Sequence, residues 1–158
     1  MAITSDMLES WRWPRVVLRR HLSRGVSEAF AFSLLFVFLI LAFVAQWPLA
    51  AAEAHVAGEP SALPRMLAVG LAVLALIPVW YGLAALSHLV ARVFGGKGGW
   101  YGARMALFAA LVAIGPLMLL QGLVAGMVGP GAGLTAMRVL VGLGFLYIWI
   151  NMLIEAER

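Results

Sequence analysis

The chain has 158 residues, of which 64% are hydrophobic and only 11% charged, with a formal net charge of +4 and a mean hydropathy of +1.00. A water-soluble domain has roughly a quarter of its residues charged, so this composition excludes a soluble fold and indicates an integral membrane protein. The chain has no cysteine, which excludes disulfides and thiolate metal sites, and its three histidines are too scattered to predict a metal site.

Residues 1–28 form a basic, amphipathic arm that we expect to lie as a helix on the membrane surface. Leu18, Leu22 and Val26 recur every four residues, which is typical of a helical apolar stripe. The arm binds anionic lipid in one interpretation, and in the other it only fixes topology and anchors the first span. These roles are not exclusive, and both use the arginines of the arm: Arg12, Arg15, Arg19, Arg20 and Arg24.

The first two uncharged runs contain 24 and 26 residues, and about 20 apolar residues suffice to cross the hydrocarbon core. They predict spans at about 29–50 and 66–92. Pro78 lies in the middle of the second span, where it removes one backbone hydrogen bond, so we expect this helix to bend there.

The third uncharged run, residues 105–137, is too long for one crossing. It contains the sequence Gly-Pro-Gly-Ala-Gly at 129–133, which is a strong turn signal. We therefore expect a third span at about 104–127, bent at Pro116, and a fourth at about 134–154.

These spans make residues 29–158 an all-α domain of four transmembrane helices. Nine basic residues fall on one side of the predicted membrane, whereas only Arg65 and Arg138 fall on the other. Because cytoplasmic segments are enriched in Lys and Arg, we expect both termini in the cytoplasm. The nine are the five arginines of the arm together with Arg92, Lys97, Arg104 and Arg158.

Several short stretches resemble small bacterial members of the Yip family, the Ypt/Rab-interacting membrane proteins. This resemblance implies a non-enzymatic protein of the bacterial inner membrane, either cytoplasmic or intracytoplasmic. It does not imply a vesicle-trafficking role, because the eukaryotic relatives are similar to five-span proteins of a secretory pathway that bacteria lack. The stretches are Ala45-Gln46-Trp47-Pro48, residues 86–92 (LSHLVAR), residues 99–104 (GWYGAR), Gly129-Pro130-Gly131 and residues 155–158 (EAER).

Polar and small residues inside the spans predict contacts between helices. Gln121 lies 17 residues after Arg104, and Arg138 lies 17 residues before Glu155, so the two side chains should lie at a similar depth in the membrane. We expect them to meet, or Arg138 to extend to the headgroups. Gly122 and Gly126 form a Gly-x-x-x-Gly surface for close helix packing, within the four-helix domain or in a dimer. Tryptophans suited to the headgroup layer are Trp11, Trp13, Trp47 and Trp100.

His88 lies near the cytoplasmic end of the second span. The spacing Ala84-x-x-x-His88 resembles that by which light-harvesting polypeptides present a histidine to bacteriochlorophyll. The pattern is common in alanine-rich helices, so we favour a histidine that bonds to a neighbouring helix or headgroup. We expect Glu28, Arg92, Arg104 and Glu155 to lie in the same layer and to form ion pairs between helices.

The spans contain no carboxylate, and no catalytic arrangement is recognisable. We therefore predict an accessory subunit without enzymatic activity, packed against other integral membrane subunits of a photosynthetic or respiratory complex and surrounded by lipids. No cofactor and no nucleic acid are expected. The alternatives are a small transporter or channel with broken helices at Pro78 and Pro116, and a lipid-organising, curvature-sensing protein that uses the arm.

Overall fold

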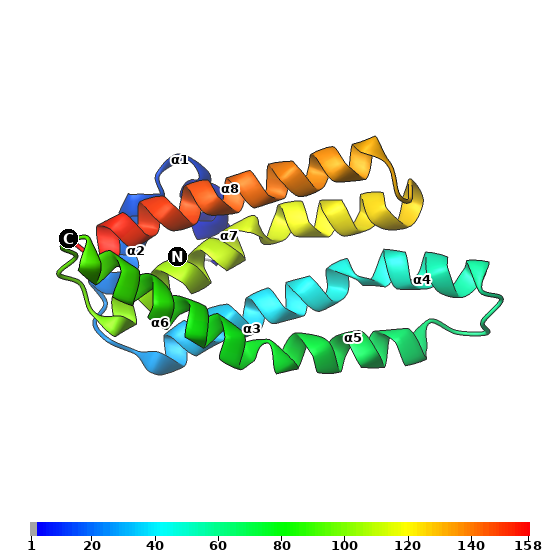
Figure 1. The fold of residues 1–158 in the computed structure, drawn as a ribbon, viewed down its shortest axis with the longest axis horizontal. Coiled ribbons are helices and arrows are strands. Elements are labelled where there is room, and N and C mark those ends of the chain that lie inside the picture. Colours follow the sequence, from blue (N-terminus) through cyan, green and yellow to red (C-terminus); the bar gives the residue numbers. More distant parts are fainter. Residues whose placement is uncertain (1–2) are drawn as a thin grey trace.

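The computed structural model describes residues 3–158, and every regular element in that range is a helix (Figure 1). Two short helices form the arm and six form the rest of the chain. Their bounds are α1 Ile3–Arg12, α2 Pro14–Leu22, α3 Glu28–Ala45, α4 Trp47–Val56, α5 Leu63–Ala75, α6 Ile77–Val93, α7 Trp100–Met127 and α8 Ala132–Ala156.

Four helical segments are long and apolar enough to cross a membrane, so the chain is a multi-pass membrane protein. The predicted spans are confirmed in number and order, and the turn at 128–131 separates the last two. Each span is a few residues longer than expected. The largest difference is in the first, which was expected to end near residue 50. The spans are Glu28–Val56, Leu63–Val93, Trp100–Met127 and Ala132–Ala156.

Prolines interrupt two of the four spans. The second span divides into α5 and α6 just before Pro78, as predicted. The first span divides into α3 and α4 just before Pro48, and this break was not predicted from the sequence. Both prolines fall in the first turn of the following helix, where a missing N–H leaves no extra carbonyl unpaired.

Pro116 lies inside α7, which stays one helix and does not divide there as the second span does before Pro78. The bend expected at Pro116 stays a prediction. A proline inside a helix weakens the hydrogen bonds of the preceding turn. Three residues before Pro116, the carbonyl of Ala113 accepts a hydrogen bond from Trp11 Nε1 at 3.1 Å. The carbonyl that Pro116 leaves without its usual partner is that of Val112, four residues earlier. The bond from Trp11 anchors the arm at the next carbonyl along α7.

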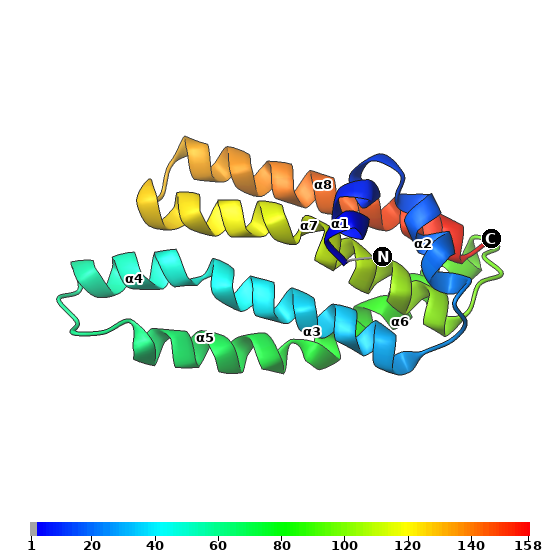
Figure 2. The same ribbon diagram turned by 180° about the vertical axis from the view of Figure 1, so that it is seen from behind.

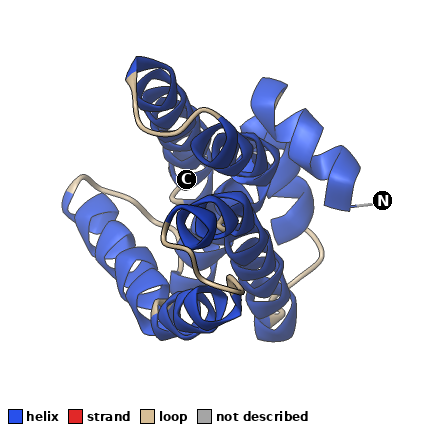
Figure 3. Ribbon diagram, turned by 90° about the vertical axis from the view of Figure 1, so that its right-hand side faces the viewer, coloured by secondary structure: helices blue, strands red, loops and turns tan. Residues whose placement is uncertain are grey.

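The helix α7 lies at the centre of the bundle. All residues from Met105 to Gly115 are buried, and α7 packs against α3, α4, α6, α8 and both arm helices. We call the end formed by residues 23–27, 94–99 and the C-terminus the basic end, and the end formed by 57–62 and 128–131 the turn end. Figures 1 and 2 show the arm beside α7 and α8 in the half of the bundle nearer the basic end, and Figure 3 shows both turns from the turn end.

Small residues let the first span approach the backbone of α7. A Cβ added at Gly122 would overlap the carbonyl oxygen of Ala45, and one at Gly126 would overlap Pro48. The Gly-x-x-x-Gly surface is therefore occupied inside the chain by α3 and α4, and it is not free for a dimer contact. Such close approach gains packing energy where the hydrophobic effect does not bring helices together.

This close approach predicts the effect of a single methyl group. Gly122→Ala should destabilise the bundle by about 1–3 kcal/mol, because Ala45 must move to admit the new Cβ. Gly142→Ala is the matched control, since no atom lies within 4 Å of the position its Cβ would take. Reversible unfolding in mixed detergent micelles measures both. Equal stabilities of the two variants would contradict the packing.

Candidate functional site

The arm is docked on the bundle by two arginines of α2. Arg15 Nε donates to Asn151 Oδ1 at 3.1 Å, and Arg19 binds Glu155 Oε1 at 2.7 Å through Nη2 and 2.9 Å through Nε. Arg15 and Arg19 are four residues apart on α2, and Asn151 and Glu155 are four residues apart on α8, so one face of α2 matches one face of α8. These two arginines, expected to face lipid, therefore hold the arm to the last span.

A third arginine closes the arm on itself. Arg20 in α2 binds Glu9 through both terminal nitrogens, each at 2.9 Å, and Asp6 at 3.1 Å. The hydrogen bond from Arg20 lowers the pKa of the Glu9 carboxyl. The contact joins α1 to α2, so α1 and α2 form a closed helical hairpin.

Trp11 carries the arm to the middle of the bundle. Its bond to Ala113 lies halfway along α7, and a Cβ on Gly144, halfway along α8, would lie 2.6 Å from its ring. Trp11 therefore packs against α7 and α8 at the mid-length of both helices, and its expected place in the headgroup layer stays a prediction. The side chains expected to contact lipid headgroups are about half exposed: Trp13 at 56%, Trp47 at 51% and Trp100 at 48%.

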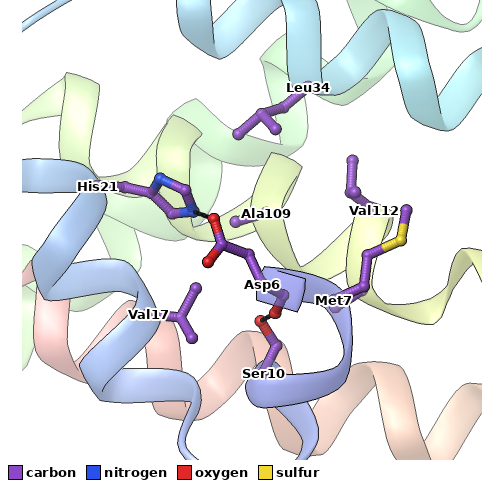
Figure 4. Close-up of a pocket in the computed structure, with 9 residues that line it drawn as sticks. Asp6, Met7, Ser10, Val17, His21, Leu34, Ala109 and Val112 are labelled. Atoms are coloured by element: carbon purple, nitrogen blue, oxygen red, sulfur yellow. Dashed lines mark hydrogen bonds and ion pairs between the residues drawn. The ribbon is translucent and has the colours of Figure 1, made fainter. Parts of the chain in front are cut away.

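A small polar pocket is enclosed between the arm and the bundle (Figure 4). Its polar walls are Asp6, Ser10 and His21, all at least nine-tenths buried, and its apolar walls include Leu34 of α3 and Ala109 of α7. The cavity of about 20 Å³ has room for about one water molecule. It is too small for an organic substrate.

The three polar residues of this arm pocket do not form a nucleophilic relay. The Ser10 hydroxyl donates to the backbone carbonyl of Asp6 at 2.6 Å, so it does not face the imidazole as a nucleophile would. His21 Nε2 lies 3.6 Å from Asp6 Oδ2, too far for a hydrogen bond. Its Nδ1 is buried and has no partner in the described chain. Burial lowers the pKa of His21, opposed by the Asp6 carboxylate and reinforced by Arg24 and Arg20.

The C-terminus is fixed at the basic end by a second buried histidine. His88 is 1% exposed, and its Nδ1 lies 2.6 Å from Oε1 of Glu157. The other carboxylate oxygen of Glu157 accepts the backbone N–H of Gly98 at 3.1 Å, and its carbonyl oxygen accepts the N–H of Lys97 at 2.8 Å. We call these contacts the C-terminal latch.

The latch bears on the two interpretations of His88. Its ring lies 4.5 Å from that of Trp100, and Ala84, the small residue expected to make room for a macrocycle, is completely buried. A flat pigment has no space beside this imidazole. The structure therefore favours the histidine that bonds to a neighbouring element over the bacteriochlorophyll ligand.

The other predicted contacts are met in part. Arg104 Nη2 donates to Glu28 Oε1 at 2.5 Å, which joins α7 to α3. Gln121 and Arg138 share no hydrogen bond within the described chain, and Arg138 is exposed. Two side chains at a similar depth do not meet when they leave their helices in different directions. The polar residues that the sequence reading missed are Asp6, Ser10, His21, Asn151 and Glu157.

The buried His21 predicts a pH dependence of arm docking. Since its pKa is lowered in the docked arm, docking is fully favoured above the ordinary value of 6.5. It should weaken as the pH falls from 6.5 toward the lowered pKa, because the released arm binds the proton more tightly. Hydrogen exchange of the α1–α2 amides, corrected for the intrinsic rate at each pH, measures this loss. His21→Met should abolish the pH step and the exposed His55→Gln should keep it; a step unchanged in His21→Met would contradict the assignment.

The latch predicts different outcomes for two adjacent glycines. A Cβ added at Gly98 would overlap the carbonyl oxygen of Ala156. A Cβ added at Gly99 would have no surrounding atom within 4 Å. Gly98→Ala should therefore release the C-terminus and speed carboxypeptidase removal of Arg158 by roughly tenfold, since overpacking costs about 1–3 kcal/mol. Gly99→Ala should digest like the unchanged protein. Equal rates for the two variants would show that Glu157 is not held by this loop.

No family model matches the chain, and no curated protein or solved structure is similar enough to match it. The resemblance to the Yip family stays a prediction. The account of function therefore depends on the geometry of the chain.

Proposed function

We propose that this chain is an accessory subunit without enzymatic activity that packs its second span against a larger complex of the bacterial inner membrane. The observation that carries the proposal is the exposure of this span. Only 6% of its most apolar 18-residue window is buried within the chain, compared with 56% for α7. Helices in lipid associate through close packing, so a span with little packing inside its own chain has a surface to offer a partner.

The exposed surface of α5 has a regular shape. Leu67, Leu71 and Leu74 are 62%, 71% and 50% exposed, and their spacing of four and then three residues is that of a coiled-coil seam. Met66, at 1% exposed, faces inward. We call Leu67, Leu71 and Leu74 the leucine stripe; it supports docking of an apolar helix from a partner subunit.

The distribution of basic residues supports an orientation with the basic end in the cytoplasm. Nine of the eleven Lys and Arg residues belong to the arm, the 94–99 loop and its flanks, and the C-terminus. Short cytoplasmic segments of inner-membrane proteins carry this excess. Both termini would then lie inside the cell, next to the cytoplasmic parts of a partner.

The contacts of the arm make its use as a free lipid-binding segment less favoured. Arg15, Arg19 and Arg20 bind polar residues of the chain itself. Transport is also less favoured, because the polar cavity level with the middle of the bundle holds about 20 Å³. A carrier needs a larger site near the membrane midplane.

Co-purification tests the accessory role. After gentle extraction we expect another integral membrane protein to travel with the chain at fixed stoichiometry, and Leu71→Gln to release it. Leu140→Gln is the matched control, because Leu140 is 55% exposed and, like Leu71, lies eight residues from the start of its helix at the turn end. A photo-reactive residue at position 71 should cross-link that protein, and one at 140 should label lipid. A chain that purifies alone, with lipid adducts from both positions, would contradict the proposal.

A further inference from the structure

A second pocket opens between α6 and α7 near the basic end, apart from the arm pocket and the latch. It has a volume of about 400 Å³ and is lined by Tyr81, Ala85, Trp100 and Arg104. Trp100 is the first residue of α7, and Arg104 lies one turn further in. An arginine beside aromatic side chains at the end of an apolar span occupies the depth of the headgroup layer.

The guanidinium of Arg104 is only partly satisfied. Nη2 binds Glu28, but Nε is buried and has no hydrogen-bond partner in the described chain. The Glu28 side chain is 53% exposed, so the ion pair is open to its surroundings. The Arg104 side chain is 26% exposed, and the exposed part of a planar guanidinium suits a phosphate oxygen, which accepts charge-assisted hydrogen bonds.

The charges around the pocket favour an anion. Arg92 and Lys97 are exposed near the same end of the bundle, and Glu157 is occupied by His88 and Gly98. The N-terminus of α7 has no side-chain cap at Gly99, which adds positive potential. Of the carboxylates at this end, Glu28 is the one bound to Arg104, and Glu155 pairs with Arg19 and Arg158.

Exposed apolar side chains continue along α3 from Glu28, the ion-pair partner of Arg104. Phe32, Phe36 and Ile40 follow Glu28 along the exposed face of α3, at 43%, 46% and 48% exposed. They lead to a groove of about 210 Å³ between α3 and α5, lined only by apolar residues from Phe36 to Phe43 and from Gly70 to Leu74. This groove begins about 12 Å below Glu28 at 1.5 Å per residue, within the roughly 15 Å depth of one leaflet.

From this geometry we propose that Arg104 binds the phosphate of an anionic phospholipid of the leaflet at the basic end. The headgroup lies in the pocket between Tyr81 and Trp100, and one acyl chain follows α3 into the apolar groove. Glu28 competes with the phosphate for the guanidinium and so sets the affinity. This binding is a property of the chain alone and does not depend on the accessory role.

The test uses the purified full-length chain in a neutral detergent, titrated with phosphatidylglycerol and followed by native mass spectrometry. Arg104→Gln should weaken lipid retention by about fivefold, the contribution of one basic residue near an anionic headgroup. Glu28→Gln should strengthen retention, because it removes the competing carboxylate. Arg138→Gln is the matched control, since this exposed arginine lies near the turn end, and it should not change retention.

A second variant keeps the proposal falsifiable if loss of Arg104 impairs folding. Ala85→Leu fills the pocket and leaves the Arg104–Glu28 ion pair in place, so it should also reduce retention. Unchanged lipid binding in both Arg104→Gln and Ala85→Leu would overturn the proposal. Displacement of the lipid by millimolar inorganic phosphate would assign the site to a free anion and would also overturn it. Retention of phosphatidylcholine as strong as that of phosphatidylglycerol would show that the negative charge of the lipid is not recognised, and would overturn the proposal as well.

Discussion

The structure depends on the close packing of backbones against α7. In lipid the hydrophobic effect does not bring helices together, and association depends on contact and on polar bonds. The buried run from Met105 to Gly115 consists largely of alanine and other small or medium residues. It admits α3 on one side and α8 with the arm on another. Gly122 extends this contact to Ala45 near the kink of the first span.

Arg65 binds Glu53 and Glu59 at the turn end. The polar contacts near the basic end join elements that are more distant in sequence. Arg19 joins the arm to α8, Arg104 joins α7 to α3, and Glu157 joins the C-terminus to α6 and the glycine-rich loop. A charge near hydrocarbon is costly unless it is paired. These pairs therefore hold the basic end together, while the outer face of α5 keeps little contact with the rest of the chain. This division leaves most of the second span exposed, which is the surface that the proposed partner would cover.

The spans could be predicted because their signals are local. Uncharged runs, Pro78 and the glycine-rich turn at 129–133 each act within one helix or one connection. The docking of the arm was harder to predict, because it depends on contacts between α2 and α8, which are far apart in the sequence. One signal was present: Arg15 and Arg19 have the same four-residue spacing as Asn151 and Glu155. The arm pocket gave no such signal, since a carboxylate and a histidine in a basic segment are typical of a solvated surface.

The central claim is that α7 is shielded from lipid along its buried half. A membrane-soluble carbene reagent, photolysed with the unchanged protein in its bilayer and mapped by mass spectrometry, tests this claim directly. The structure predicts labelling of the exposed side chains of α8, including Leu140 and Leu143, and almost none between Met105 and Gly115. Labelling of 105–115 as strong as that of α8 would show that α7 faces lipid, and would contradict the arrangement of every helix around it.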